Sequence, residues 1–258
     1  MEVRNVSRHQ LSSERWEQIS RQIQQPSLSL SARAALRLKL FLEEEDAVLM
    51  PDDPIPAWRT LISFPDIYAE GEKERLCAGC WVHEQGRVCN ISSDWEGVLK
   101  SGLLARREKG NKDMQLTIDA VIAYADRYED ENLSHVIRYG ANSYLSAMQM
   151  FRILHFCLWA SNVYHNTVGR YDQYMYPYFK ADLDSGKLDA ETALKLTEEF
   201  FLSFNRDSDL YIGMQQGDNG QSLMLGGCKA DGSCAVNELT YIWKANSISI
   251  SLHLNLFL

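Results

Sequence analysis

The stretch Ser143–Ser161, SYLSAMQMFRILHFCLWAS, is apolar around almost its whole circumference when it is wound as a helix. Such a helix is stable in water only where other elements cover all of its sides. Its most apolar window, Met150–Ala160, is interrupted by Arg152 and His155 and is much shorter than the about 20 apolar residues that span a membrane. The stretch therefore predicts a buried helix inside a larger folded body.

Amphipathic periodicity predicts further helices on both sides of this stretch, over residues 31–49, 112–128 and 190–204. Asp189 is the expected N-cap of the last one, because its carboxylate can accept the unpaired amide hydrogens of a first helical turn. Another helix is expected to begin near Val236. The basic side chains of the first helix are expected to be solvated: Arg33, Arg37 and Lys39.

The final residues, Ser247–Leu256, alternate strictly between polar and apolar side chains, which is typical of a half-buried β-strand. One or two extended strands are also expected near a Gly-rich segment, residues 213–232. Because helical patterns dominate, the predicted fold class is α/β and helix-rich. We expect a polar N-terminal segment over residues 1–30, a main domain over 31–242, and a divergent tail over 243–258 that forms the strand.

The composition excludes several classes of protein. The 258 residues carry 26 Lys and Arg against 35 Asp and Glu, a formal net charge of −9, and no basic stripe that would neutralise nucleic-acid phosphates. The polar N-terminus, MEVRNVSRHQ, is unlike a signal peptide, and six cysteines are too few for a disulfide scaffold of this size. We therefore expect a cytoplasmic protein that binds neither nucleic acid nor membrane.

One CxxC motif, Cys77–Cys80, raises the question of a zinc site. His83 and Cys89 could complete the four ligands that structural zinc requires. The neighbouring side chains are apolar and aromatic, which suits buried free thiols equally well. A single pair is a weak signal, and we predict no metal site.

The segment His165–Gln173, HNTVGRYDQ, places polar side chains directly behind the apolar stretch. Buried polar groups must be hydrogen-bonded, so two interpretations stay open. The segment is either a pocket wall for a small polar ligand or an internal network in which Arg170 and Asp172 are structural charges. The aromatic run Tyr174–Phe179 is expected to pack in the core. The Gly-rich segment has neither Walker nor dinucleotide-binding spacing, which excludes a nucleotide site.

The strings HNTVGRYDQYMYPYF (165–179), GDNGQSLMLGG (217–227) and NELTYI (237–242) closely resemble segments of the glycyl radical enzymes, the group of pyruvate formate-lyase and the diol dehydratases. Residues 86–99 are similar to an earlier segment of that family. The match runs in the family's order through most of residues 30–242, so the main domain resembles a pyruvate formate-lyase-like domain. The resemblance implies an α/β barrel wrapped in helices, of which this chain supplies an incomplete, N-terminal part.

The resemblance also implies site residues, position by position. One group would line the substrate pocket: His165, Asn166, Thr167, Asp94 and Trp95. A second group would form the network that supports it: Arg170, Asp172, Gln173, Asp218, Asn219 and Gln221. For the last three of these, a structural role is expected.

In the family, an activating enzyme that uses S-adenosylmethionine and an iron–sulfur cluster installs a radical on a backbone glycine. The radical passes to a catalytic cysteine, which abstracts hydrogen from a small polar substrate, and a C–C or C–O bond breaks. The resemblance implies no directly bound cofactor. The family's catalytic cysteine and its Arg-Val-x-Gly-Tyr-like loop lie downstream of the NELTY segment, and neither Cys228 nor Cys234 stands at the catalytic position.

We therefore predict a truncated lyase or dehydratase of anaerobic metabolism that has no catalytic residue of its own and is inactive alone. The alternative is a non-catalytic half-barrel subunit. It would associate through Ser247–Leu256 with a complementary C-terminal subunit, or with a second copy as a homodimer.

Overall fold

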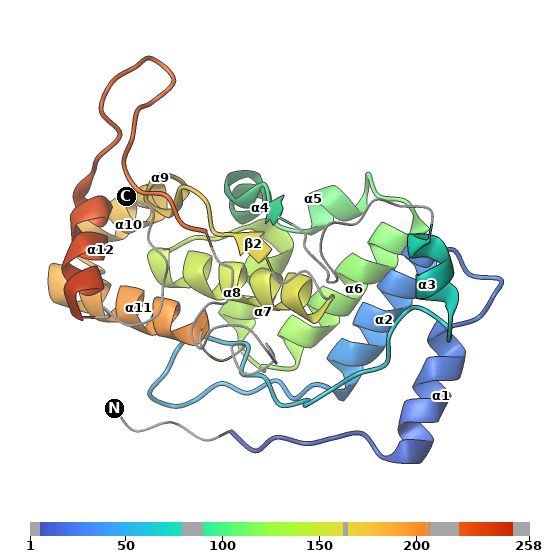
Figure 1. The fold of residues 1–258 in the computed structure, drawn as a ribbon. Helices are drawn as coiled ribbons and strands as arrows, with labels where there is room; N and C mark the ends of the chain where they lie inside the picture. The colour runs from blue at the N-terminus through green and yellow to red at the C-terminus, as the bar shows by residue number, and fades with distance from the viewer. Residues whose placement is uncertain (1–5, 79–89, 162–164, 205, 207–221, 250–258) are drawn as a thin grey trace.

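Helix α8 (Tyr144–Ala160) runs through the middle of a body built mostly from helices (Figure 1). The fold is that of a computed structural model, which describes residues 6–78, 90–161, 165–204, 206 and 222–249. Ser143 starts α8 with a capping box, in which its hydroxyl and that of Ser146 each accept the other residue's amide hydrogen. Most side chains of α8 are buried, which confirms the buried helix predicted for Ser143–Ser161.

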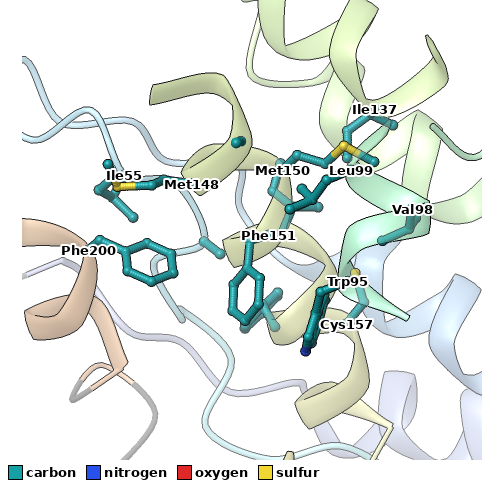
Figure 2. Packing of buried hydrophobic residues seen from close by; sticks show 14 of the residues in the cluster. Ile55, Trp95, Val98, Leu99, Ile137, Met148, Met150, Phe151, Cys157 and Phe200 are labelled. Carbon is teal, nitrogen blue, oxygen red and sulfur yellow. The ribbon is translucent and has the colours of Figure 1, made fainter. Parts of the chain in front are cut away.

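Helix α6 (Lys112–Asp126) packs on α2 (Leu30–Glu44) and on α7 (Glu131–Tyr139), and all three contact α8. Figure 2 shows the centre of this core, where Phe151 of α8 lies between Trp95 and Phe200. The remaining helices are α1 (Ser13–Ile23), α3 (Glu72–Cys77), α4 (Trp95–Ser101), α5 (Leu104–Arg107), α9 (Tyr171–Tyr174), α10 (Tyr176–Asp184), α11 (Ala190–Leu202) and α12 (Glu238–Ser249). Among the described residues, no helix combines the length and apolar character that crossing a membrane requires.

A small parallel sheet lies beside the helical body. Strand β1 (Asn90–Ser92) pairs with β2 (His165–Thr167), with Asn90 opposite His165. A parallel bridge between Gly169 and Leu223 brings a third extended run alongside the chain that leaves β2. Parallel neighbours that come from distant segments, connected through helices, confirm the predicted α/β class.

The prediction that Arg33 and Arg37 are solvated is wrong, because both side chains are buried. The Arg37 guanidinium donates to the carbonyl oxygens of Pro65 (2.7 Å) and Ala160 (2.5 Å). The Arg33 guanidinium pairs with the Glu72 carboxylate at 2.7 Å. A buried guanidinium is stable where acceptors meet its donors, and here loops and neighbouring helices supply them.

The first predicted helix also ends earlier than expected, at Glu44 instead of residue 49. Glu45 is extended and fully buried, and its carboxylate accepts the amide hydrogens of Thr60 and Leu61. These bonds require the chain to leave the helix at this point. Within the segment predicted to be polar, Ile19 and Ile23 of α1 are fully buried against Leu40 of α2, so this segment contributes to the packing.

The strand predicted at the end of the chain is wrong for Ser247–Ser249, which form the end of α12. Helix α12 presents Leu239 and Trp243, four residues apart, to the buried side, and the Trp243 ring meets Phe201 of α11 at 4.4 Å. This helical packing overrides the local alternation of polar and apolar residues. Residues 250–258 of the predicted strand lie outside the described residues.

Candidate functional site

The candidate site begins where β2 ends and the chain turns into α9. The Val168 amide donates to the Ser222 carbonyl oxygen at 2.8 Å, and the Met224 amide donates to the Gly169 carbonyl oxygen at 2.9 Å. Gly169 has a positive φ of 71°, a conformation that favours glycine. The polar segment after β2 is thus held against the described end of the Gly-rich region.

Asp172 is the centre of a polar network and is fully buried. Its Oδ2 accepts hydrogen bonds from the Gly226 amide (2.7 Å) and the Thr240 hydroxyl (2.5 Å). Its backbone carbonyl accepts from Nδ2 of Asn237 at 2.7 Å. Its other oxygen, Oδ1, is buried and has no hydrogen-bond partner among the residues that the structure describes. Asp172 therefore connects α9 to two parts of the chain that lie far downstream.

Arg170 and Gln173 extend this network to the same downstream segment. Nη2 of Arg170 donates to the Gly226 carbonyl oxygen at 2.7 Å, and Nε2 of Gln173 donates to the Ala235 carbonyl oxygen at 2.8 Å. Gly226 and Gly227 have positive φ angles of 63° and 78°, which explains the paired glycines. We call Arg170, Asp172, Gln173 and their partners in residues 226–240 the Asp172 network.

The structure thus brings together Arg170, Asp172 and Gln173, for which a supporting network was predicted. Asn237 and Thr240 are members that the sequence analysis did not single out, although both lie in the NELTYI string. Their signal is a helix start: the Asn237 side-chain oxygen accepts the Thr240 amide hydrogen at 3.1 Å, as an N-cap does. The side chains of Asn237 and Thr240 also form hydrogen bonds with Asp172, and no local sequence pattern predicts these long-range contacts.

The residues predicted to line a pocket occupy different surroundings. Asn166 of β2 is fully buried, and Thr167 beside it is partly buried. The Trp95 indole donates from Nε1 to the Thr167 carbonyl oxygen at 2.8 Å, while its ring packs on Phe151 at 4.0 Å. Trp95 therefore joins β2 to the helical body. His165 is the first residue of β2, and only its backbone is described.

Asp94 lies at the outer end of α4 and is the N-cap of that helix. Its Oδ1 accepts the Gly97 amide hydrogen at 3.0 Å, and Oδ2 pairs with the Arg106 guanidinium at 2.7 Å. Its side chain is 71% exposed. These contacts account for an acidic residue before Trp95 as a helix cap.

The other predicted network residues, Asp218, Asn219 and Gln221, lie outside the described residues. The same is true of residues 79–89, which hold most of the candidate zinc ligands. Within the described ranges, no group of three or more His, Cys, Asp or Glu side chains is arranged to hold a metal ion.

Buried hydroxyl and thiol groups near the site are held in their neutral forms. The Tyr144 hydroxyl lies 3.0 Å from that of Tyr171 and 2.9 Å from that of Thr197, and burial raises the pKa of Tyr144 to about 12. Burial also raises the pKa of Tyr174 well above its usual value, and this hydroxyl donates to the Val168 carbonyl oxygen. Burial likewise raises the pKa of the Cys157 thiol to about 12, which makes it a poor nucleophile.

Comparison with known proteins agrees with this arrangement. Residues 130–243 match the family model described as pyruvate formate lyase-like. Isethionate sulfite-lyase of Oleidesulfovibrio alaskensis is 31% identical over 91 residues, which cover 33% of this chain and 11% of that protein. (2S)-3-Sulfopropanediol dehydratase of Klebsiella oxytoca is 34% identical over 88 residues, which cover 32% of this chain and 11% of that protein.

Solved structures match almost the whole chain. One, which concerns 1,2-propanediol dehydration in Roseburia inulinivorans, has a TM-score of 0.70 at 19% identity and covers 96% of this chain and 44% of that one. The glycerol-bound form of the B12-independent glycerol dehydratase from Clostridium butyricum has a TM-score of 0.70 at 18% identity, with 96% and 45% covered.

The chain is therefore a relative of the glycyl radical enzymes, and the resemblance of its motifs to that family is confirmed. Its fold corresponds to part of the α/β barrel of those enzymes, as predicted. The chain spans less than half the length of these solved structures, and the matched segments cover about a tenth of the curated relatives.

Proposed function

We propose that β2 and the residues that support it form one wall of the substrate cavity of a glycyl radical enzyme that acts on a small polar metabolite. The chemistry of the whole enzyme would be radical cleavage of a C–C or C–O bond. The observation that carries this proposal is the Asp172 network, which joins α9, the helix that follows β2, to residues 226–240. A binding wall needs such rigid support, because its polar groups must hold their positions when the ligand enters.

In this proposal, His165, Asn166 and Thr167 of β2 contact the substrate, and Trp95 holds β2 in place through its bond to the Thr167 carbonyl oxygen. Asp94 acts on this wall only indirectly, as the cap of α4. The Asp172 network supports β2 from behind and does not contact the substrate. Asp218, Asn219 and Gln221 belong to the same supporting network. The named relatives act on a sulfonate or a diol, so the proposed substrate class is a small polar alcohol or sulfonate.

The 258 residues contain no Arg-Val-x-Gly-Tyr string, and we place no catalytic cysteine in them. We propose that turnover requires both features from the remainder of a barrel, and that the activating enzyme acts on that remainder. The test is anaerobic incubation of the 258-residue chain with a glycyl-radical-activating enzyme, S-adenosylmethionine and a reductant. We expect no glycyl doublet by electron paramagnetic resonance and no turnover of 1,2-propanediol, glycerol or isethionate. Turnover by this chain alone would contradict the proposal.

Substrate binding can be tested separately from turnover. Titration calorimetry with 1,2-propanediol, glycerol and isethionate should detect binding to the chain, or to a complex in which the barrel is complete. We expect His165→Ala and Asn166→Ala each to weaken binding by about tenfold or more, because each removes a polar contact. Lys109→Ala, at an exposed position, is the matched control. If both β2 variants bind as the parent chain does, the assignment of the wall is wrong.

A second candidate function is that of a non-catalytic half-barrel subunit. The observation that favours it is that, within the described ranges, β1 pairs with β2 alone and has no strand on its other side. Strand edges readily pair with another chain. Light scattering across a range of concentrations tests association between copies, and a monomer at every concentration argues against a homodimer.

A further inference from the structure

Residues 226–235 form a tight antiparallel turn next to the Asp172 network. The Ala235 amide donates to the Gly227 carbonyl oxygen at 2.9 Å, and the Lys229 amide donates to the Ser233 carbonyl oxygen at 2.8 Å. Cys228 and Cys234 lie between these two bonds and are paired in an antiparallel bridge. Both cysteines are exposed and free.

The turn beyond the two cysteines is well defined. The Gly232 amide donates to the Lys229 carbonyl oxygen at 3.0 Å, and Gly232 has a positive φ of 82°. Oδ1 of Asp231 accepts from the amide (2.9 Å) and the hydroxyl (2.6 Å) of Ser233. The opposition of the two cysteines is therefore fixed by hydrogen bonds on both sides of the pair.

This register brings the two thiols within reach of each other. The two backbone hydrogen bonds, Ala235 to Gly227 and Lys229 to Ser233, flank the two cysteines and do not join them, so Cys228 and Cys234 are a non-hydrogen-bonded pair. In such a pair the Cα atoms lie about 4.5 Å apart and both side chains are on one face of the ribbon. A disulfide requires a Cα separation of about 4.4–6.8 Å. This separation falls inside that range, so a disulfide can form without unfolding, and because both cysteines are exposed the bond stays accessible to reductants. Cys157, buried inside α8, has no such access.

We propose that Cys228 and Cys234 are a reversible dithiol–disulfide pair that is oxidised by a small-molecule disulfide. The thiolate of one cysteine attacks the reagent, forms a mixed disulfide and releases one small thiol. The second thiolate attacks the mixed disulfide, forms the Cys228–Cys234 bond and releases the second small thiol. The protein gives up two electrons and two protons, and the reagent is reduced to two thiols.

The position of the pair connects its redox state to the Asp172 network. Gly226, two residues before Cys228, donates its amide to Asp172, and Ala235, directly after Cys234, accepts from Gln173. Oxidation closes a short loop and reduces the freedom of the chain between these two anchors. The disulfide therefore stabilises the segment that is anchored to Asp172 and Gln173. The inference stands on the turn alone and does not depend on the proposed function.

The test uses the chain with Cys77, Cys80 and Cys89 replaced by serine, equilibrated with graded ratios of oxidised and reduced glutathione. Peptide mapping by mass spectrometry should find the Cys228 and Cys234 peptides joined, with two hydrogens lost, and Cys157 unmodified. The melting temperature should rise by a few degrees on oxidation and return when reduced glutathione is restored. If the triple variant does not fold, the same mapping is done on the unsubstituted chain.

Cys228→Ser and Cys234→Ser are the matched controls. Each should retain one glutathione as a mixed disulfide, because the resolving thiol is gone, and should show no rise in melting temperature. Glutathione on both cysteines of the parent chain, without an intrachain bond, would overturn the proposal. So would a joined peptide that pairs Cys228 or Cys234 with Cys157.

Discussion

The helical body around α8 and the Asp172 network are held together by different interactions. In the body, stability is spread over many apolar contacts, and Phe151 alone meets the rings of Trp95, Tyr174 and Phe200. In the network, a few directional hydrogen bonds join residues 54 to 68 positions apart in the sequence. The body should therefore lose stability in proportion to the volume removed, whereas the network should fail locally when one acceptor is lost.

The largest effect is expected from Phe151→Ala in the helical body. The side chain is fully buried, so its removal leaves a cavity and should lower the free energy of unfolding by about 3–5 kcal/mol. Urea denaturation measures the loss. Met114→Ala, at a position 42% exposed on α6, is the control and should change stability by less than about 1 kcal/mol. Equal effects from the two variants would show that Phe151 is not at the centre of the core.

The next effect is expected from Asp172→Ala, which leaves the Gly226 amide and the Thr240 hydroxyl without their acceptor. We expect a loss of about 2–4 kcal/mol. Hydrogen exchange should rise at the Gly226 amide more than at the amides of α8. Asp172→Asn retains one side-chain acceptor oxygen and should cost less. Uniform loss of protection in both regions would mean that the network and the body unfold as one unit.

Trp95 joins the helical body to β2, the strand that leads to the Asp172 network, and Trp95→Phe separates its two contributions. Phenylalanine keeps an aromatic ring near Phe151 but cannot donate to the Thr167 carbonyl oxygen. We expect a loss of about 1 kcal/mol in chemical denaturation from the hydrogen bond. Trp95→Ala removes both contributions and should cost about 3–5 kcal/mol. If the two variants are equally destabilised, the ring contact contributes nothing.

The smallest effect concerns the buried carboxyl group of the helical body. Burial raises the pKa of Glu45 above its ordinary value of 4.5. The protonated form is thus favoured in the folded state, and the contribution of Glu45 to stability is lost as the pH rises through the raised pKa. The side chain at position 45 of the Glu45→Gln variant does not titrate. The free energy of unfolding of this variant, relative to that of the parent chain, should therefore increase as the pH rises above about 4.5.

The opposite pH dependence of other carboxyl groups cancels in this comparison. The arginine partners of Asp119 and Asp126 lower the pKa of each carboxyl, so these two stabilise the fold above their unfolded pKa and lose that effect in acid. Both groups are present in the parent and in Glu45→Gln. A difference between the two proteins that stays constant from pH 4 to pH 7 would contradict the assignment of a raised pKa to Glu45.

Local patterns predicted the helices well where burial and capping are local properties. The continuous apolar stretch became α8, and Asp189 caps α11 by accepting the Thr192 amide hydrogen at 2.7 Å. The same reasoning was wrong for Arg37, because periodicity assigns a charged side chain to solvent. It could not include a carbonyl oxygen from Ala160, 123 residues away.

The site shows the same division. The resemblance of the HNTVGRYDQYMYPYF string to a family identified Arg170, Asp172 and Gln173 as a group, but it did not identify their partners. The roles of His165, Asn166 and Thr167 in binding remain predictions. Asn237 and Thr240 have a local signal only as a helix cap, and their contacts with Asp172 depend on how α12 is placed.

The sequence by itself determined that α8 and α11 are helical, that α8 is buried, and to which family the motifs are related. Those properties follow from the types of residues that recur at short spacing, and they do not depend on where in the fold the helix packs. Only the tertiary structure decided that β1 pairs with β2, that Asp172 holds residues 226 and 240, and that Cys228 faces Cys234. The physical reason is that each of these contacts requires a particular closure of the chain, and many closures are compatible with the same local pattern.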